Sequence, residues 1–542
     1  MKRDLKFINT SYLNYMMEVG YKLTERYNWK PVYWFVDDIT GPLIKSKFPD
    51  AITHDCYQGI KGIFPEQLSN MEMGVVDENL LNEMAVCESI SLNMMERNDS
   101  TNSFSHQERL RHYHSLLKYW LGVLDLLSPD VILFEEEPHA AFDYVLYCLA
   151  KKRGIQIILF VRTNFQARMF PVNVFENGSG IIKSEYQKKL SNLGNSIIRN
   201  FDFADDIKTF VKKAQSNDHE LLLQQQFYDQ LDRFYEIRNK KRIDAIKGKL
   251  KRLSPYLNLF SLMGKISRLP DTLSHLFKVY PYSDQKKKNK SFKESRFRNL
   301  DILLTIRKTL KSKMSLKKYY ETLQTNHPDL QQPYILCALA YQPEKTTSPM
   351  AEHFVNQLLM IELVRKAMPP HWKLYVKEHP CQFTWFLIYG EQYRSAEYYD
   401  RIKALPNTEL IPIFYNTFPL VDNCKAIATT TGSIGFEAVL RNKPVLTFGY
   451  PWFQYCEGIF ESGDYTELQK QIKKIENGYI PDQHKVNLFI ETIQENSYEG
   501  VVGGQTYQKF CGEKGLPEKN SEEHLKAIIT LMDYNEKYQN NS

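Results

Sequence analysis

The stretch Ser128–Val161, SPDVILFEEEPHAAFDYVLYCLAKKRGIQIILFV, most constrains how this chain folds. The apolar run Val131–Phe134 predicts a buried strand, His139–Lys152 has the spacing of an amphipathic helix, and Ile155–Val161 predicts a second strand. Gly154 stands where a helix C-cap is expected. A strand, a helix and a strand in this order form a βαβ unit, which requires a parallel sheet with helical crossovers.

The same alternation extends towards the N-terminus. Ser11–Tyr27 has helical spacing, Pro31–Asp38 is a short apolar run that ends in two acids, and Asp50–Tyr57 is a further strand candidate. His106–Leu127 predicts a long amphipathic helix. We therefore predict an α/β domain over residues 1–181.

A second α/β domain is predicted over residues 331–480. Its predicted elements are strands at Tyr334–Glu344, His371–Pro380 and Leu410–Phe414, helices at Met350–Met368 and Trp385–Leu405, and a strand–helix–strand run ending at Gly449. Residues 182–330, which lie between the domains, are polar, basic and mainly helical in pattern. Residues 481–542 form a predicted helical tail, with a terminal helix at Ser521–Asn535.

Length and composition favour a soluble protein of two domains. A chain of 542 residues is too long for one ordinary hydrophobic core. No apolar run reaches the roughly 18–20 residues that a membrane span needs, and the first residues lack the apolar stretch of a signal peptide. None of the eight cysteines forms a CxxC pair, so we expect free thiols in a reducing compartment. These features together predict a cytoplasmic location.

The positive charge of the chain is concentrated in residues 238–318, which hold 24 Lys and Arg against 5 Asp and Glu, a net charge of +19. Residues 240–269 mix these lysines with apolar side chains, a pattern that suits peripheral attachment to an anionic membrane surface. A solvated helical face or a bound acidic polymer is also compatible with this charge. Nucleic acid is a less favoured partner, because no recognisable nucleic-acid-binding module accompanies the charge.

A run of hydroxyl residues lies where a predicted strand passes into a helix. Thr429–Thr431 end the strand, Gly432 permits the turn, and the helix begins near Ser433. A helix N-terminus offers unpaired N–H groups and partial positive charge, so the run suits a phosphate or diphosphate. Glu437 is placed one turn later to accept hydrogen bonds from two vicinal hydroxyls, as on a ribose. The alternative is that Ser433 simply caps the helix and the threonines finish the strand.

Polar residues also end the other strands of the second domain. His379 ends a strand as KEHP, close after Lys377, and an imidazole there can donate a hydrogen bond to a phosphate. Gln342 and Glu344 follow the first strand of this domain. The simpler alternatives are a surface-loop histidine and the N-terminal box of a helix. Because ligands of open parallel sheets bind at the carboxyl ends of strands, we predict that these residues line one site.

Acidic residues end two strands of the first domain. Three consecutive glutamates, Glu135–Glu137, precede His139, and their mutual repulsion is expected to raise the pKa of at least one. Glu137 with His139 is our preferred general base or acid. Asp37 and Asp38, which end the predicted strand Pro31–Asp38, are the alternative pair for this role.

Four pieces in order, EEEPHAAFD, YQPEKTTSP, VKEHP and TTTGSIGFEAVLRNKPVLTFG, resemble the capsule polysaccharide biosynthesis family of bacterial surface-carbohydrate proteins. That family includes glycosyltransferases that add 3-deoxy-manno-octulosonic acid from a CMP-activated donor. The resemblance is clearest over Gln332–Gly449 and thinner over Ser128–Arg168. It implies two Rossmann-like domains in a GT-B arrangement, with a basic, mainly helical middle region.

The resemblance also implies site residues. The donor nucleotide sugar binds the C-terminal domain, and His379, Thr430, Thr431 and Ser433 hold its phosphate. Some members of the CMP-sugar branch carry paired serines in this loop, where the present chain reads Thr-Thr-Thr-Gly-Ser. The N-terminal domain receives a glycan or lipid-linked acceptor, at the inner face of the cell membrane if the protein is peripheral.

The expected chemistry is transfer of a sugar by direct displacement, with no cofactor other than the nucleotide-sugar substrate. No DxD-like metal motif ends a predicted strand, so His379, Lys377 and the helix dipole are expected to neutralise the donor phosphate without a metal ion. One alternative is a teichoic-acid-type transferase that uses a CDP-polyol donor. An epimerase is less favoured, because it has no need of the basic region. Another is a non-catalytic protein that binds polyanions or membranes on a transferase scaffold.

Overall fold

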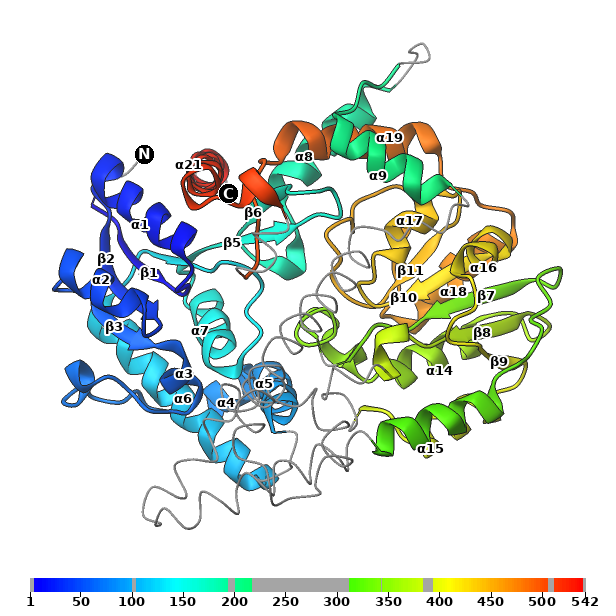
Figure 1. Ribbon diagram of the computed structural model, residues 1–542, viewed down its shortest axis with the longest axis horizontal. Helices are drawn as coiled ribbons and strands as arrows, with labels where there is room; N and C mark the ends of the chain where they lie inside the picture. The colour runs from blue at the N-terminus through cyan, green and yellow to red at the C-terminus, as the bar shows by residue number, and fades with distance from the viewer. Residues whose placement is uncertain are drawn as a thin grey trace, which may run out of the picture.

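The computed structural model describes residues 4–99, 104–193, 200–216, 311–342, 344–383, 393–504 and 511–539. Two six-stranded sheets flanked by helices lie side by side (Figure 1). The predicted fold of two Rossmann-like domains in a GT-B arrangement is therefore confirmed. Of the basic segment 238–318, only residues 311–318 lie within the described ranges, where they belong to a helix over 311–323.

The N-terminal sheet has the strand order β3-β2-β1-β4-β5-β6. All neighbours pair in parallel except β6, which is antiparallel to β5. The strands are β1 (Lys6–Asn9), β2 (Lys30–Val36), β3 (Ile52–Asp55), β4 (Val131–Leu133), β5 (Gln156–Arg162) and β6 (Met169–Val172). The helices of this domain are α1 (Asn14–Tyr27), α2 (Thr40–Lys47), α3 (Cys56–Ile60), α4 (Glu78–Glu83), α5 (Ala85–Asn98), α6 (His106–Leu127) and α7 (Ala141–Lys152).

The C-terminal sheet is parallel throughout, in the order β12-β11-β10-β7-β8-β9. Its strands are β7 (Tyr334–Ala338), β8 (Lys373–Lys377), β9 (Thr408–Ile411), β10 (Ala426–Thr429), β11 (Val445–Thr447) and β12 (Ile459–Glu461). Its helices are α14 (Gln357–Ala367), α15 (Ala396–Ala404), α16 (Thr417–Asn423), α17 (Ile434–Leu440) and α18 (Tyr465–Glu476). The strands are nearly all apolar because helices cover both faces of such a sheet.

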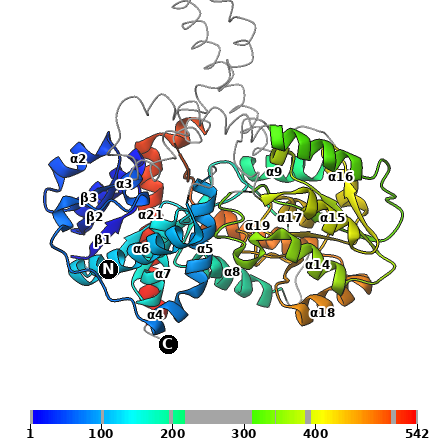
Figure 2. The ribbon, with the colours of Figure 1, turned by 90° about the horizontal axis from the view of Figure 1, so that it is seen from below.

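Four further helices connect the two halves: α8 (Gly180–Ser191), α9 (Asp205–Gln215), α19 (Gln483–Asn496) and α21 (Pro517–Gln539). Helix α19 packs on α8, α9 packs on α17, and α21 returns to pack on α1 of the N-terminal domain (Figures 1 and 2). Lys22 of α1 pairs with Glu522 of α21 at 2.9 Å. The last part of the chain thus completes the first domain, and the predicted boundary at residue 181 falls within α8.

An aromatic cluster joins the domains at the side of α17. The ring of Phe436 on α17 lies edge-on to Phe165 of the N-terminal domain, with centroids 5.9 Å apart, and 4.7 Å from Trp452. The indole N–H of Trp452 donates to Asn164 Oδ1 at 2.6 Å. The rings at this position belong to one hydrophobic cluster that extends through both domains.

The predicted helix Met350–Met368 is shorter in the structure. Its first part folds as a turn and a 3-10 segment, Glu352–Val355, and the α-helix begins at Gln357. The carbonyl oxygen of Met350 accepts from the N–H of Tyr450 at 3.0 Å, so it serves a contact with a distant loop. At this point a contact between distant residues overrides the helix that the local sequence pattern predicts.

Candidate functional site

The order of strands reverses once in each sheet, between β1 and β4 in the first and between β7 and β10 in the second. Ligands of open α/β sheets bind outside the carboxyl ends of the strands at such switch points. In the N-terminal domain, Glu135–Glu137 follow β4. In the C-terminal domain, Gln342 and Glu344 follow β7, and Thr430–Ser433 follow β10. These predicted residues therefore lie at the positions that the topology favours for a ligand, whereas His379 follows the neighbouring strand β8 and Asp38 follows β2.

The two loops of the C-terminal switch point are joined to each other. The hydroxyl of Thr431 donates to the carbonyl oxygen of Thr346 at 2.8 Å. A Cβ atom at Gly449 would lie 2.8 Å from Thr431 Cγ2, and one at Gly432 would lie 2.9 Å from Thr429 Oγ1. Glycine at both positions allows the loops to pack this closely.

Three hydroxyls at this switch point are buried and have no hydrogen-bond partner among the described residues: those of Ser348, Thr429 and Thr430. Leaving a buried polar group unpaired costs about 1–3 kcal/mol. Such groups call for an explanation, and hydrogen bonds to a bound ligand provide one. The loops thus present unused donors where a phosphate is predicted to bind.

Ser433 stands at the N-cap position of α17, but its side chain makes no capping hydrogen bond. It lies close to Glu437, whose side chain is buried. Burial raises the pKa of Glu437 to about 7, against the opposing effects of Ser433 and Arg441. The simple cap that was the alternative for Ser433 is therefore not what the structure contains.

His379 follows β8 with its ring partly buried beside Tyr341, at a centroid distance of 6.1 Å. Its Nδ1 atom accepts a hydrogen bond from the N–H of Cys381 at 3.2 Å. Burial lowers the pKa of His379 to about 4, so the ring is neutral at pH 7 and Nε2 carries the proton. The imidazole is thus fixed as a hydrogen-bond donor through Nε2.

A buried ion pair supports this loop. Arg394 donates to Glu378 through Nε at 2.6 Å and through Nη2 at 3.3 Å, and both side chains are almost wholly inaccessible. Glu378 also accepts from the backbone N–H of His379 at 3.0 Å. Arg394 further donates to the side-chain oxygen of Gln342, whose amide group donates to Val355 O at 2.6 Å. Gln342 is thus part of the network that holds the two loops together.

Lys377 and Glu344 have protein partners of their own. The ammonium of Lys377 donates to the carbonyl oxygen of Ile413 at 2.9 Å, and burial lowers the pKa of Lys377 to about 8. Glu344 accepts from Thr346 Oγ1 at 3.2 Å, within the loop after β7. In this structure Lys377 therefore supports the backbone near β9, while Glu344 supports its own loop.

The acids that follow β4 face the C-terminal domain. Lys345 donates to Glu136 and, at 2.8 Å, to Glu137, whose side chain is buried. Burial opposes ionisation of Glu136, but the charges of Lys345 and His139 outweigh it and lower the pKa of Glu136 to about 2. These contacts bring the two switch points together.

Glu135 is held differently from its two neighbours. It accepts from Tyr15 OH at 2.9 Å, from Ser11 Oγ at 3.0 Å and from the N–H of Gly503 at 3.2 Å. Burial and the charge of Glu136 raise the pKa of Glu135 to about 7. The expectation that crowding raises the pKa of one of the three glutamates is consistent with this difference.

His139 lies beside these acids, with Nδ1 3.7 Å from Glu136 Oε1, and its ring is nearly half exposed. The competing aspartates lie at the end of β2. Asp37 accepts from the N–H and hydroxyl groups of Thr40, both at 2.8 Å, and so caps α2, while Asp38 is exposed. Strand β1 separates β2 from β4, and the contacts with the C-terminal domain described above come from the residues after β4.

Three basic residues at this junction were not predicted as site residues. Lys345 bridges the domains, Arg394 neutralises Glu378, and Arg97 of α5 donates to the carbonyl oxygens of His139 and, at 3.5 Å, of Ser348. Lys345 follows the Gln-Pro-Glu turn directly, which was an available signal. Arg97 and Arg394 lie in segments without a recognisable motif, so no sequence pattern indicated a role for them.

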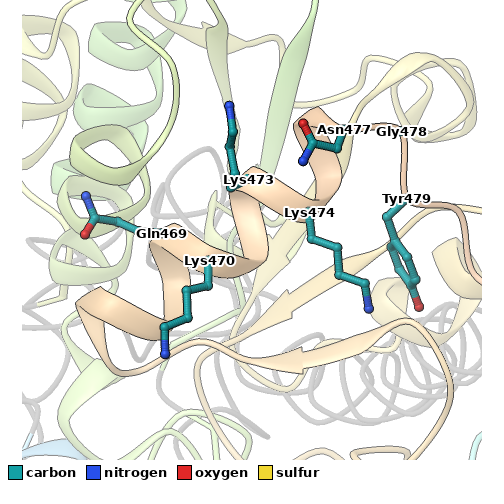
Figure 3. A pocket seen from close by; sticks show the side chains of 7 residues that line it. All are labelled: Gln469, Lys470, Lys473, Lys474, Asn477, Gly478 and Tyr479. Carbon is teal, nitrogen blue, oxygen red and sulfur yellow. The ribbon is translucent and has the colours of Figure 1, made fainter.

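A surface hollow of about 860 Å³ lies elsewhere, along α18 and the turn after it (Figure 3). Its lining residues are Gln469, Lys470, Lys473, Lys474, Asn477, Gly478 and Tyr479, none of which is a predicted site residue. Across the described ranges, no helix is long and apolar enough to span a membrane. Nor do the described side chains include a cluster of three or more His, Cys, Asp or Glu that could hold a metal ion.

Residues 345–487 match the family described as capsule polysaccharide biosynthesis protein. The match runs from the loop after β7 into α19, so it contains the threonine loop and the His-Pro turn. It confirms the predicted resemblance for this part of the chain. No curated protein sequence matches the chain.

Solved structures resemble the chain only distantly. MnaA of S. aureus, solved with UDP, shares 10% identity over 93% of this chain and 94% of its own, with a TM-score of 0.22. KpsC of Thermosulfurimonas dismutans, a beta Kdo 2,7 transferase, shares 14% over 43% of this chain and 65% of its own, also with a TM-score of 0.22. The trehalose-6-phosphate phosphatase N-terminal domain of Candida albicans shares 10% over 94% and 97%, with a TM-score of 0.28. Likenesses this weak carry no argument about activity.

Proposed function

We propose that this chain, whose residues 345–487 carry the sequence of the capsule polysaccharide biosynthesis family, is a glycosyltransferase of surface polysaccharide synthesis. It moves a sugar from a nucleotide-sugar donor, with a CMP-linked ulosonic acid favoured, to a glycan or lipid-linked acceptor. The observation that carries the proposal is the meeting of the two switch points. One offers hydrogen-bond donors for a phosphate, and the other offers carboxylates for an acceptor hydroxyl.

The donor phosphate lies between the His-Pro turn and the threonine loop in this proposal. His379 donates through Nε2, because Nδ1 is occupied by the N–H of Cys381. The hydroxyl of Thr430 and the backbone of the Gly432 turn supply further donors. Donors that are fixed before the reaction stabilise the charge that develops on the leaving nucleotide without reorganising.

The acceptor hydroxyl approaches from the N-terminal domain. Glu137 or His139 assists its deprotonation, with Asp38 as the less favoured base. In this structure Glu137 is bound to Lys345, whereas the ring of His139 is more exposed. The sugar is transferred by direct displacement, and the nucleotide leaves towards His379.

The first test is thermal stabilisation of the purified protein by CMP, CDP, UDP, GDP and dTDP, each with and without magnesium. A nucleotide at about 100 times its Kd adds roughly 2.7 kcal/mol of stability. We expect a magnesium-independent shift with CMP that His379→Ala abolishes. His371→Ala, at an exposed histidine of the same domain, should keep the shift and is the matched control.

The outcomes separate the candidates. A shift with CDP alone favours the polyol-phosphate transferase, and product analysis then distinguishes a phosphodiester from a glycosidic link. No shift with any nucleotide contradicts a preformed donor site. That result would favour a non-catalytic protein that binds membranes or polyanions. For such a protein, deletion of residues 238–318 abolishes this binding, while His379→Ala has no effect.

A further inference from the structure

Lys345 lies at the point where the two domains and the threonine loop meet. Its ammonium is bound by Glu136 and Glu137 of the N-terminal domain. Its chain neighbour Thr346 accepts the hydrogen bond from Thr431. About a fifth of the Lys345 side chain (21%) remains exposed. A ligand in the C-terminal switch point can therefore reach Lys345 without disrupting the core.

The other basic groups near the two C-terminal loops differ from Lys345 in their partners or in their charge. Lys377 is buried and donates to a backbone carbonyl group. Arg394 is almost wholly inaccessible and bound to Glu378 of its own domain. The imidazole of His379 is kept neutral by burial. Arg97 also crosses between the domains, but its acceptors are the carbonyl oxygens of Ser348 and His139. Among these described groups, Lys345 is the one paired with carboxylates of the opposite domain, and such a pairing can be exchanged for a ligand.

The charges around Lys345 favour an exchange of this kind. Glu136 is fully ionised at pH 7, because Lys345 and His139 outweigh the effect of burial and lower its pKa to about 2. Two carboxylates beside a phosphate site repel the incoming anion, at a distance where screening by salt is incomplete. The same carboxylates hold the ammonium in place while the site is empty.

We propose that Lys345 binds the phosphate of the donor, and that Glu136 competes with this phosphate for the ammonium of Lys345. The inference rests on the proposed function, because it assumes that a nucleotide sugar occupies the C-terminal switch point. When the donor binds, Lys345 turns from the acids to the phosphate, and this ion-pair contact between the domains is released. Glu137 is then free to face the acceptor, so a base becomes available only after the donor is in place.

The test is a double-mutant cycle on nucleotide affinity, measured by titration calorimetry with the full chain and the nucleotide that stabilises it most. Lys345→Gln should weaken binding about tenfold, the usual range for loss of one charge-assisted hydrogen bond. Glu136→Gln should tighten binding roughly threefold or more, because the competing charge is removed. In the Lys345→Gln background, Glu136→Gln should tighten binding by a smaller factor, because only the direct repulsion of the phosphate is then removed.

A matched control is available in the same domain. Glu409 is paired with Lys373 on neighbouring strands, away from both switch points. Glu409→Gln removes one carboxylate from one ion pair and should leave nucleotide affinity unchanged. If Lys345→Gln does not fold, Lys345→Arg and Glu136→Gln carry the test, with tightening by Glu136→Gln as the expected result.

Weaker or unchanged binding in Glu136→Gln overturns the inference while the proposed function stands, because the wild-type protein still binds its nucleotide. Unchanged binding in Lys345→Gln overturns it in the same way. Failure of the wild-type protein to bind any nucleotide contradicts the proposed function itself, and the inference falls with it. The wild-type arm therefore distinguishes the two failures.

Discussion

Thr431 donates its hydroxyl hydrogen to the carbonyl oxygen of Thr346 at 2.8 Å, which joins the loops that follow β10 and β7. The hydroxyl of the preceding residue, Thr430, is buried and has no partner among the described residues. Thr431 therefore joins the two loops, whereas the hydroxyl of Thr430 is unpaired among the described residues. This difference between adjacent residues of one type makes a direct test possible.

Thr430→Val should separate ligand binding from stability. The variant keeps the shape of the side chain but removes the hydroxyl, so we expect nucleotide affinity to fall about tenfold. The melting temperature of the free protein should stay the same or rise, since an unpaired buried hydroxyl is lost. Calorimetric titration and thermal unfolding measure the two effects.

The control for that experiment is Thr492→Val. Thr492 is also buried, but its hydroxyl donates to Leu488 O at 2.7 Å within α19. We expect this variant to lose about 1 kcal/mol of stability and no affinity. Equal affinity of Thr430→Val and the wild-type protein would show that the hydroxyl of Thr430 does not serve the ligand.

Arg394→Met should destabilise the C-terminal domain strongly. The variant leaves the carboxylate of Glu378 buried without its countercharge, which costs about 3–5 kcal/mol. The double variant Glu378→Gln/Arg394→Met should recover much of this loss, because no charge then remains buried. Urea unfolding followed by circular dichroism measures both.

An exposed ion pair of the same domain provides the comparison. Arg401 and Glu362 are 2.9 Å apart, and both side chains are substantially exposed. Arg401→Met should therefore cost less than about 1 kcal/mol. A loss in Arg394→Met no larger than in Arg401→Met would contradict a structural role for the buried pair.

Glu437→Gln should change how stability depends on pH. Burial raises the pKa of Glu437 from 4.5 to about 7, so the folded protein keeps a proton that the unfolded chain releases above pH 4.5. The free energy of unfolding of the wild-type protein therefore falls as pH rises from about 4.5 to 7, by about 3 kcal/mol in total. Glutamine never ionises, so the variant avoids this loss.

We expect Glu437→Gln to be more stable than the wild-type protein at pH 8, with a difference that shrinks towards pH 5. Urea unfolding at pH 5, 6, 7 and 8 measures it. A difference that is the same at every pH would mean that Glu437 does not titrate in this window.

Ile528→Ala should destabilise the N-terminal domain, although residue 528 lies near the opposite end of the chain. Ile528 is fully buried in the core that α21 shares with α1. Truncating it should cost about 2–5 kcal/mol. Lys526→Ala, on the exposed face of the same helix, should stay within about 0.5 kcal/mol. Equal unfolding midpoints for the two variants would contradict the packing of α21.

Much of the fold follows from local sequence pattern. The predicted helix His106–Leu127 agrees with α6 at both ends, because a Ser105 cap and a Glu108 partner mark its start. Strand β1, by contrast, was not predicted. Its four residues, Lys6–Asn9, are too short to show a period, and pairing with β2 and β4 defines the strand. Antiparallel β6 was missed for a related reason.

The candidate site was predictable only where it is made of strand ends. Motif position placed Thr430 at the C-terminal switch point and His379 at the end of the neighbouring strand β8, because the topology of a parallel sheet fixes where its strands end. Contacts between distant residues carry no such signal. Lys345 and Glu136 are 209 residues apart, and a single sequence does not show that their charges meet. The role of Lys377 is likewise set by the carbonyl group of Ile413, which lies just after β9.

The return of α21 to the first domain has a consequence for biosynthesis. The ribosome releases α1 and the strands of the N-terminal sheet long before residues 517–539 exist, so the apolar surface that α21 covers stays open through most of translation. The C-terminal sheet has its strands within one continuous stretch and needs no such wait. The domain that is made first is therefore the one completed last, and its uncovered apolar surface is open to aggregation while the rest is synthesised.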